Sequence, residues 1–227
     1  MCTQSDFDTC VRLREVELAV QGRIGGVAIK PIYVEILIDA DMDRVWELTQ
    51  DTNAHPRWDL RFSSITPTGT TSDGASRFKY ELRVPGHTLA GTGISLGERR
   101  REDGARTSAL RFTSSDRLSP LGEGRGYWRY IPTPQGVRFL TGYDYRPGWG
   151  LLDSMGVRWL VGWMTAWSFD RLRIWAETAQ EPERWPWWTA FALWRPDRPR
   201  ASRCLRQPSR GRAMDDSPQT LDTLDAP

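Results

Sequence analysis

Histidine and cysteine are scarce in this sequence. Its 227 residues include two histidines, His55 and His87, and three cysteines, which are Cys2, Cys10 and Cys204. A protein zinc site takes three or four ligands, and a disulfide framework uses an even number of cysteines at short spacings. The sequence therefore predicts no metal site and no disulfide. The two histidines stand in a predicted turn and a predicted hairpin, where we expect them at the surface.

Long apolar runs and nucleotide-binding motifs are also missing. The longest apolar stretch, WLVGWMTAWSF at residues 159–169, is shorter than the ~18 residues that a membrane-spanning helix needs. No hydrophobic segment follows a basic N-terminus, which favours a cytoplasmic location over secretion. The patterns GxGxxG, GxxxxGKS/T and GxSxG do not occur. We therefore expect no nucleotide or flavin, and no other cofactor.

Neither sign of charge is in large excess. Thirty-one Lys and Arg residues stand against 29 Asp and Glu residues, and the formal net charge is +2. A balance this close does not predict a nucleic-acid partner. The mean hydropathy of −0.56 is typical of a chain that folds in water.

What the sequence does contain is a clear change of period within residues 32–59. The β-branched residues of its first part alternate as in a half-buried strand: Val34, Ile36 and Ile38. Asp39 or Asp41 then stands where a helix cap is expected, and Val45 and Trp46 share one face of the helix that follows. The predicted order is a strand followed by a short helix.

Further strands and one long helix are expected downstream. Six segments separated by turn-forming residues alternate with period two, and they are residues 58–65, 77–84, 87–96, 107–114, 124–131 and 136–145. Residues 151–179 lose this period and contain no proline, which predicts one long helix with Trp159 and Trp163 on a shared face. A curved antiparallel sheet with a C-terminal helix follows from this order.

This order of elements resembles that of the SRPBCC superfamily. The resemblance is carried by VEILIDADMDRVWELTQDTNAHPRWD, at residues 34–59, and by WSFDRLRIWAE, at residues 167–177. The superfamily includes START-type lipid carriers, polyketide cyclase and aromatase-like proteins, and pollen-allergen-like ligand carriers. The resemblance implies the helix-grip fold, an α+β architecture in which a curved antiparallel β-sheet wraps around a long C-terminal α-helix. It also implies a cavity between sheet and helix.

The resemblance divides the chain into three parts. Residues 1–29 are predicted to be an N-terminal extension, and residues 30–179 to be the helix-grip ligand-binding domain. Residues 180–227 are rich in Trp, Arg and Pro before an acidic end, so that they are predicted to be a partly disordered extension.

Twelve tryptophans are the most informative feature of the composition. The residues predicted to line a ligand-binding cavity take inward strand positions or one face of the long helix, and they are Trp58, Tyr80, Leu82, Phe112, Trp128, Tyr130, Phe139, Tyr143, Trp159 and Trp163. The alternative interpretation is that these side chains only fill a hydrophobic core. Their number and the polar tips of Tyr and Trp instead favour a pocket for a small hydrophobic or amphipathic ligand, lipid or polyketide-like.

Enzymatic activity of the polyketide cyclase or aromatase kind is the alternative hypothesis. It requires an acid or base inside the cavity with a pKa shifted by burial. The candidate carboxylates are Asp59, Glu81 and Asp144, but the last two alternate onto the polar faces of their strands, and Asp59 is expected to cap or salt-bridge locally. Ligand binding or transport without chemistry is the favoured prediction.

The segment Trp185–Arg212 supports a second alternative, an accessory protein at a membrane surface. WPWWTAFALWR is followed by several arginines, a combination found in interfacial anchors. The competing interpretation is a short helix packed on the domain with a solvated tail. Nucleic-acid binding ranks lower, because four aspartates near the end offset the arginines.

Overall fold

The computed structural model describes residues 23–24, 27–28, 31–98, 101–149 and 156–227. The chain forms two compact units, residues 1–31 and 32–227. In the first unit, β1 (Arg23–Ile24) pairs antiparallel with β2 (Val27–Ala28). Most of the predicted N-terminal extension lies outside the described residues. The second unit carries the sheet and all the helices discussed below.

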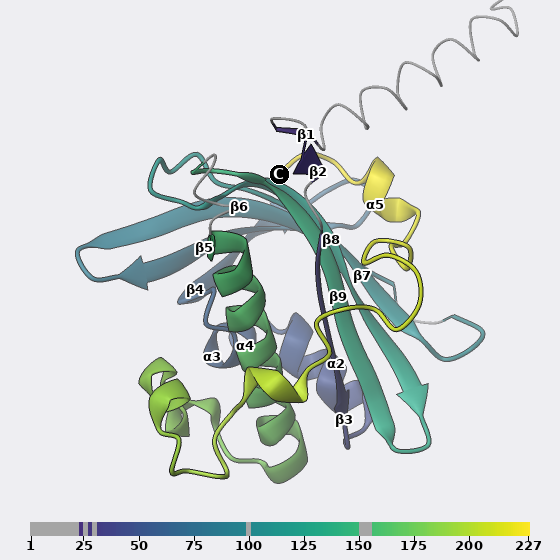
Figure 1. The fold of residues 1–227 in the computed structure, drawn as a ribbon. Helices are drawn as coiled ribbons and strands as arrows, with labels where there is room; N and C mark the ends of the chain where they lie inside the picture. The colour runs from purple at the N-terminus through teal and green to yellow at the C-terminus, as the bar shows by residue number, and fades with distance from the viewer. Residues whose placement is uncertain (1–22, 25–26, 29–30, 99–100, 150–155) are drawn as a thin grey trace, which may run out of the picture. The chain divides into compact units, whose positions relative to one another are not determined.

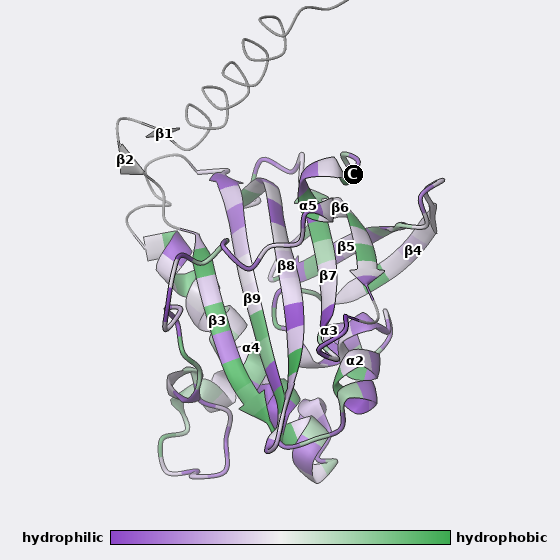
Figure 2. Ribbon diagram, turned by 90° about the vertical axis from the view of Figure 1, so that its right-hand side faces the viewer, coloured by the Kyte–Doolittle hydropathy of each residue, from purple (hydrophilic) through white to green (hydrophobic). Residues whose placement is uncertain are grey.

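The second unit opens as its periodicity predicts. In β3 (Ile32–Ile38) the residues Val34, Ile36 and Ile38 are buried in the main core, while Glu35 points to the other face. Figure 2 shows hydrophilic positions interrupting the hydrophobic ones along this strand. The helix α2 (Met42–Gln50) follows, with Asp41 at the N-cap position but without a side-chain capping bond. Its inward face is buried, as the pattern of apolar residues predicts.

The segment 58–65 is not the strand that its alternation predicts. Residues 55–58 form the single-turn helix α3 (His55–Trp58), and the next strand begins only at Ser64. Pro56 fits the first turn of a helix, where its missing N–H has no partner to lose. Trp58 therefore reaches the core from a helix and not from a strand.

Seven antiparallel strands form one sheet in the order β3-β9-β8-β7-β6-β5-β4. After β3 the strands are β4 (Ser64–Thr70), β5 (Ser76–Val84), β6 (His87–Glu98), β7 (Arg106–Thr113), β8 (Leu121–Thr133) and β9 (Gly136–Pro147). Neighbours in this order follow one another in the chain except at β3, which pairs with β9. Gly86, in the tight turn after β5, and Gly136, the first residue of β9, have positive φ values that favour glycine.

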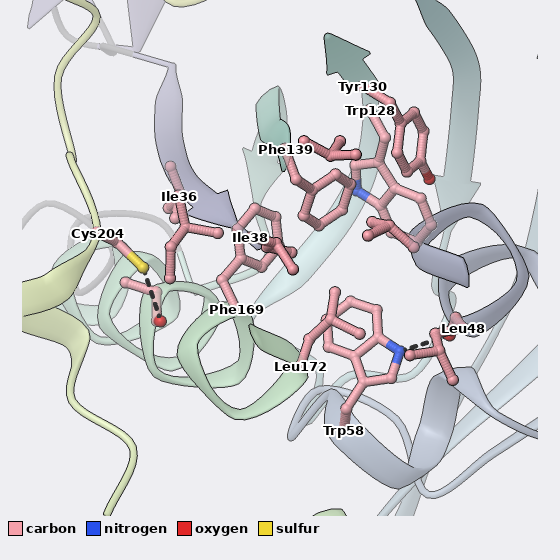
Figure 3. Close-up of a cluster of buried hydrophobic side chains, with 14 of the residues drawn as sticks. Ile36, Ile38, Leu48, Trp58, Trp128, Tyr130, Phe139, Phe169, Leu172 and Cys204 are labelled. Atoms are coloured by element: carbon pink, nitrogen blue, oxygen red, sulfur yellow. Dashed lines mark hydrogen bonds between the residues drawn. The ribbon is translucent and has the colours of Figure 1, made fainter. Parts of the chain in front are cut away.

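The long helix α4 (Arg158–Thr178) crosses the concave side of the sheet (Figure 1). It packs chiefly against β3 at the sheet edge. Phe169 of α4 stacks on Phe139 of β9 with ring centroids 4.5 Å apart, and Leu172 is fully buried nearby (Figure 3). The predicted helix-grip fold, a curved antiparallel sheet around a C-terminal helix, is confirmed.

Residues 180–227, which the sequence predicts to be a partly disordered extension, pack on this domain in the structure. They form the 3-10 turns η2 (Pro182–Arg184), η3 (Trp187–Phe191) and η4 (Ala201–Arg203), and the short helix α5 (Thr220–Thr223). Leu205 exchanges two backbone hydrogen bonds with Glu35 on the edge strand β3. The chain then crosses to the face of the sheet opposite α4, where the Tyr127 hydroxyl donates to the Ala213 carbonyl.

Two leucines hold the end of the chain on this opposite face. Leu221 and Leu224 are each 2% exposed and pack with Ile94 and Ala109 of the sheet. Salt bridges from Arg125 and Arg129 to aspartates of the segment flank this contact. In Figure 1, α5 lies beside β7. The acidic composition of this segment suggests a solvated tail, but its aspartates pair with arginines on the outer face of the sheet.

Replacing Leu221 and Leu224 by alanine is expected to release residues 213–227 while the sheet stays folded. Each buried leucine contributes about 2 kcal/mol of docking free energy, and surface salt bridges add little. Limited proteolysis should cut the double variant after residue 212 at conditions under which the unmodified protein resists. Leu205→Ala is the matched control, because that side chain is 55% exposed. Equal resistance of the double variant would contradict the docking role.

Candidate functional site

A cavity of about 570 Å³ lies between the concave face of the sheet and the segment that runs from α2 to Phe62. Its aromatic lining includes Trp46, Phe62, Phe78, Tyr80, Phe112, Trp128 and Tyr143. Small residues on the central strands leave the space open: Ser95, Gly97, Ser108 and Gly126. The volume is within the range of about 300–1,000 Å³ that small-molecule sites occupy.

The structure brings four of the ten predicted lining residues to this cavity. They are Tyr80, Phe112, Trp128 and Tyr143, which alternate inward on β5, β7, β8 and β9. Three others, Trp58, Tyr130 and Phe139, are completely buried in the adjoining core (Figure 3). Leu82, Trp159 and Trp163 are not among the lining residues.

The two helix tryptophans are displaced because α4 presents a different face to the sheet. Its buried face carries Val161, Thr165, Phe169 and Leu172, at spacings of three and four residues. Trp159, on the other side, is 62% exposed. No residue of α4, all of which the structure describes, lines the cavity. In this structure residues of α2 and α3, and not the helix tryptophans, face the sheet across the cavity.

A buried polar cluster stands at the α3 end of the cavity. Asp59 is fully buried and receives two hydrogen bonds from the Arg61 guanidinium, Nε to Oδ1 at 2.9 Å and Nη2 to Oδ2 at 2.6 Å. Its Oδ2 also lies 3.2 Å from His55 Nε2. Both His55 and Arg61 line the cavity. The prediction that His55 is a surface residue is wrong, because the ring is 7% exposed and stacks on Trp58.

Burial and pairing set the charges of this cluster. Burial alone raises the pKa of Asp59, but the charge of Arg61 and the hydrogen bonds from both neighbours outweigh it and lower the pKa below its usual range. Burial lowers the pKa of His55 more than Asp59 raises it, so the imidazole is neutral at pH 7. Despite burial, Asp59 holds the pKa of Arg61 above its usual value. The cluster is an ion pair with a neutral histidine beside it.

Arg61 points its charge toward aromatic rings of the cavity. Its Cζ lies 5.5 Å from the ring centre of Tyr143 and 5.7 Å from that of Phe62, which are cation–π distances. The Tyr143 hydroxyl is 2.8 Å from Thr165 Oγ1 of α4. Burial raises the pKa of Tyr143, against the opposing effect of Arg61. Arg61 and Tyr143 thus place a cation and a phenol hydroxyl at one end of the cavity.

A second hydroxyl lies among the strands of the cavity. Burial raises the pKa of Tyr80 to about 12, and its hydroxyl donates to the Thr113 carbonyl at 3.2 Å. Tyr80 is consequently neutral at physiological pH. The two remaining candidate carboxylates, Glu81 and Asp144, are not lining residues; they pair with Lys79 and Arg158 respectively. Of the three candidate carboxylates, Asp59 is the one that bonds to side chains lining the cavity, His55 and Arg61.

Sequence reasoning missed Arg61, His55, Phe62 and the cavity-facing role of Trp46. The first three belong to the segment His55–Phe62, HPRWDLRF, in which charged and aromatic residues stand close together. In the part of the chain that the structure describes, no three His, Cys, Asp or Glu side chains gather as a metal site would require. No helix among the same residues is long and apolar enough to cross a membrane.

Three comparisons with known proteins agree with this architecture. A family model described as polyketide cyclase / dehydrase and lipid transport matches residues 31–177. A Bacillus subtilis (strain 168) relative, named uncharacterized membrane protein YndG, is 44% identical over 161 residues, which are 68% of this chain and 60% of that protein. The chain thus spans less than two thirds of the relative's length.

The comparison with solved structures gives similarities at low sequence identity. A STAR-related lipid transfer protein from Xanthomonas axonopodis is 19% identical, with a TM-score of 0.50 over 66% of this chain and 88% of that one. The Zhui aromatase/cyclase from Streptomyces sp. R1128 is 13% identical, with a TM-score of 0.48 over 67% of this chain and 98% of that one.

The sheet, the long helix and the cavity define a helix-grip protein of the SRPBCC superfamily. Within that superfamily the chain belongs to the polyketide cyclase / dehydrase and lipid transport family, whose model covers the whole sheet and nearly all of α4.

Proposed function

We propose that this chain binds a small amphipathic ligand, lipid or polyketide-like, in the cavity beneath α2 and α3. The observation that carries the proposal is an aromatic cavity of about 570 Å³ with the charged side chain of Arg61 at its α3 end; a second arginine, Arg77, lines the cavity from β5. Aromatic walls suit a ring system or an acyl chain, and a guanidinium suits a carbonyl or carboxylate oxygen of the same molecule. The family description, which joins cyclases with lipid transport, supports this class of ligand.

Native mass spectrometry of gently purified protein tests the proposal directly. The expected result is a bound compound of a few hundred daltons, a mass that matches the cavity, which is released by organic solvent. Its extracted form should contain a ring or chain together with a carbonyl or carboxylate group. A protein that carries no compound, and binds none from a panel of fatty acids, sterols and aromatic polyketides, would contradict ligand binding.

Leu110→Trp is expected to weaken ligand binding while the protein stays folded. Leu110 lines the cavity from β7, so that a larger side chain extends into open space and not into packed atoms. We expect the dissociation constant to rise by about tenfold or more, since each 1.4 kcal/mol of lost contact changes it tenfold. Displacement of a fluorescent fatty acid measures this change.

Leu82→Trp is the matched control for this experiment. Leu82 lies on β5, separated from β7 by one strand, and is half-buried, but it is not a lining residue. The same enlargement there should leave the dissociation constant unchanged. Equal loss of binding in both variants, or none in Leu110→Trp, would place the ligand elsewhere.

A cyclase or dehydratase acting on a polyketide-like substrate is the second candidate. The specific observation in its favour is that His55 and Arg61 both reach the cavity from one buried cluster. A neutral histidine can accept a proton, and a guanidinium can stabilise the enolate that forms when a carbon next to a carbonyl loses one. Chromatography coupled to mass spectrometry separates the two candidates: a carrier returns the compound unchanged, a cyclase returns an isomer of equal mass and different retention, and a dehydratase returns a product lighter by one water.

A further inference from the structure

An unusually apolar loop follows α4 and η2. Five large apolar side chains within eight residues are exposed, which are Trp187 at 63%, Trp188 at 54%, Phe191 at 69%, Leu193 at 75% and Trp194 at 81%. We call residues 187–194 the aromatic loop. It is the pale green loop beside the lower end of α4 in Figure 1. Contiguous exposed apolar surface of this kind marks an interaction site.

Buried neighbours hold the aromatic loop in this exposed arrangement. Trp185 just before it is fully buried, and the guanidinium carbons of Arg184 and Arg195 lie 5.5 and 4.7 Å from its ring centre. Within the loop, Thr189 is fully buried and its hydroxyl donates to the Pro186 carbonyl at 2.7 Å. The fold therefore anchors one tryptophan and turns the other large apolar side chains outward.

The base of the loop is positively charged. Besides Arg184 and Arg195, the guanidinium groups of Arg200 and Arg203 both donate to the Pro196 carbonyl at 3.3 Å. Of the nearby acids, Asp197 lies 4.0 Å from Arg195, and Asp170 pairs with Arg203. Two further acids, Glu181 and Glu183, are both paired with Arg57 of α3. Arginines thus remain in excess at the base.

We propose that the aromatic loop docks the protein on an anionic lipid bilayer. Tryptophan and phenylalanine prefer the headgroup region of membranes, and arginines placed behind them reach the acidic phosphates. The positive charge at the base favours an anionic bilayer over a second copy of this chain. A second copy would bring the same excess of arginine to the contact, and the two would repel each other. The loop shares no residue with the cavity, so membrane docking and ligand binding can fail independently.

Vesicle co-sedimentation of the full-length protein tests this proposal. We expect it to sediment with phosphatidylcholine vesicles that contain phosphatidylglycerol, less with phosphatidylcholine alone, and less at high salt. The triple variant Trp188→Ser, Phe191→Ser, Trp194→Ser should partition about tenfold less, because three apolar contacts with the bilayer are gone. Trp149→Ser is the control: Trp149 is 42% exposed, follows β9 and stands before α4, and its replacement should leave partitioning unchanged.

Three results would overturn the proposal. The first is unmodified protein that stays in the supernatant with both kinds of vesicle. The second is a triple variant that retains its circular dichroism spectrum and still sediments as the unmodified protein does. The third is a dimer, found by light scattering without vesicles, that the triple variant disperses, since the occupant of the loop is then a second copy of the chain.

Discussion

Replacing Asp59 by alanine is expected to lower the free energy of unfolding by about 3–5 kcal/mol, the usual result of removing one partner from a buried ion pair. Asp59 is fully buried, and the Arg61 side chain, which lines the cavity, is only 14% exposed. Without the carboxylate, Arg61 keeps its charge but loses two hydrogen bonds. Urea unfolding measured by circular dichroism tests the expectation.

A double variant separates the pair from its surroundings. Asp59→Leu with Arg61→Leu removes both charges at once, so the loss should be clearly smaller than that of Asp59→Ala. If the double variant is as unstable as the single one, the destabilisation comes from packing and not from an unpaired charge.

The pH dependence provides an independent check on the same carboxylate. Because the folded pKa of Asp59 is lower than its unfolded value, about 3.9, its contribution to stability is present above that value. The contribution is lost as the pH falls through the lower folded pKa. Asp59→Asn cannot titrate and should therefore show a smaller decrease of stability in acid than the unmodified protein.

Local periodicity was enough to predict most of the fold. Side chains alternate along β5 and β9 whatever the rest of the chain does, so period two identifies these strands in the sequence. The same argument fails for residues 58–65, where Trp58, Leu60 and Phe62 alternate but Pro56 starts a helical turn. One turn of helix followed by a loop is too short for a period to distinguish it from a strand.

Periodicity does not predict which face of α4 is buried. Apolar residues occur around the whole helix, from Trp159 and Trp163 on one side to Val161 and Phe169 on the other. Such a helix has no single apolar stripe, and tertiary contacts decide which side is buried. The side that is buried carries Val161, Thr165, Phe169 and Leu172, and β3 is the strand that α4 contacts most.

The polar end of the cavity and the docked C-terminus depend on contacts between distant residues. Asp59 and Arg61 are neighbours in sequence, but Tyr143, against which the guanidinium lies, comes from β9. Leu221 and Leu224 are isolated apolar residues in an acidic segment. They are buried because they pack against Ile94 of β6 and Ala109 of β7 on the outer face of the sheet. Composition describes the segment alone and not the surface that receives it.

Trp58→Ala is expected to be as destabilising as the loss of Asp59, about 3–5 kcal/mol, which is typical of a buried tryptophan or phenylalanine replaced by alanine. The Trp58 ring is fully buried and packs against Phe169 and Trp128, with centroids 6.1 and 6.3 Å away. Its Nε1 donates to the Leu48 carbonyl of α2 at 2.8 Å (Figure 3). One side chain thus joins α2, α3, α4 and the sheet.

Two further variants separate the contributions of this side chain. Trp58→Phe keeps an aromatic ring but leaves the Leu48 carbonyl without its donor, so we expect a loss of about 1–3 kcal/mol. Trp159→Ala is the control, because that ring is 62% exposed, and its loss should stay within about 0.5 kcal/mol. Similar losses for Trp58→Ala and Trp159→Ala in urea unfolding would contradict the structural role of Trp58.

The same substitution should also weaken the proposed ligand site. The walls of the cavity on this side are Trp46 and Thr49 from α2 and His55 from α3, and His55 stacks on Trp58 with 4.8 Å between ring centroids. When the tryptophan is removed, α2 and α3 lose their common anchor and His55 loses its stacking partner. Fluorescent fatty-acid binding by the folded fraction of Trp58→Ala should therefore weaken, whereas Trp159→Ala should bind as the unmodified protein does.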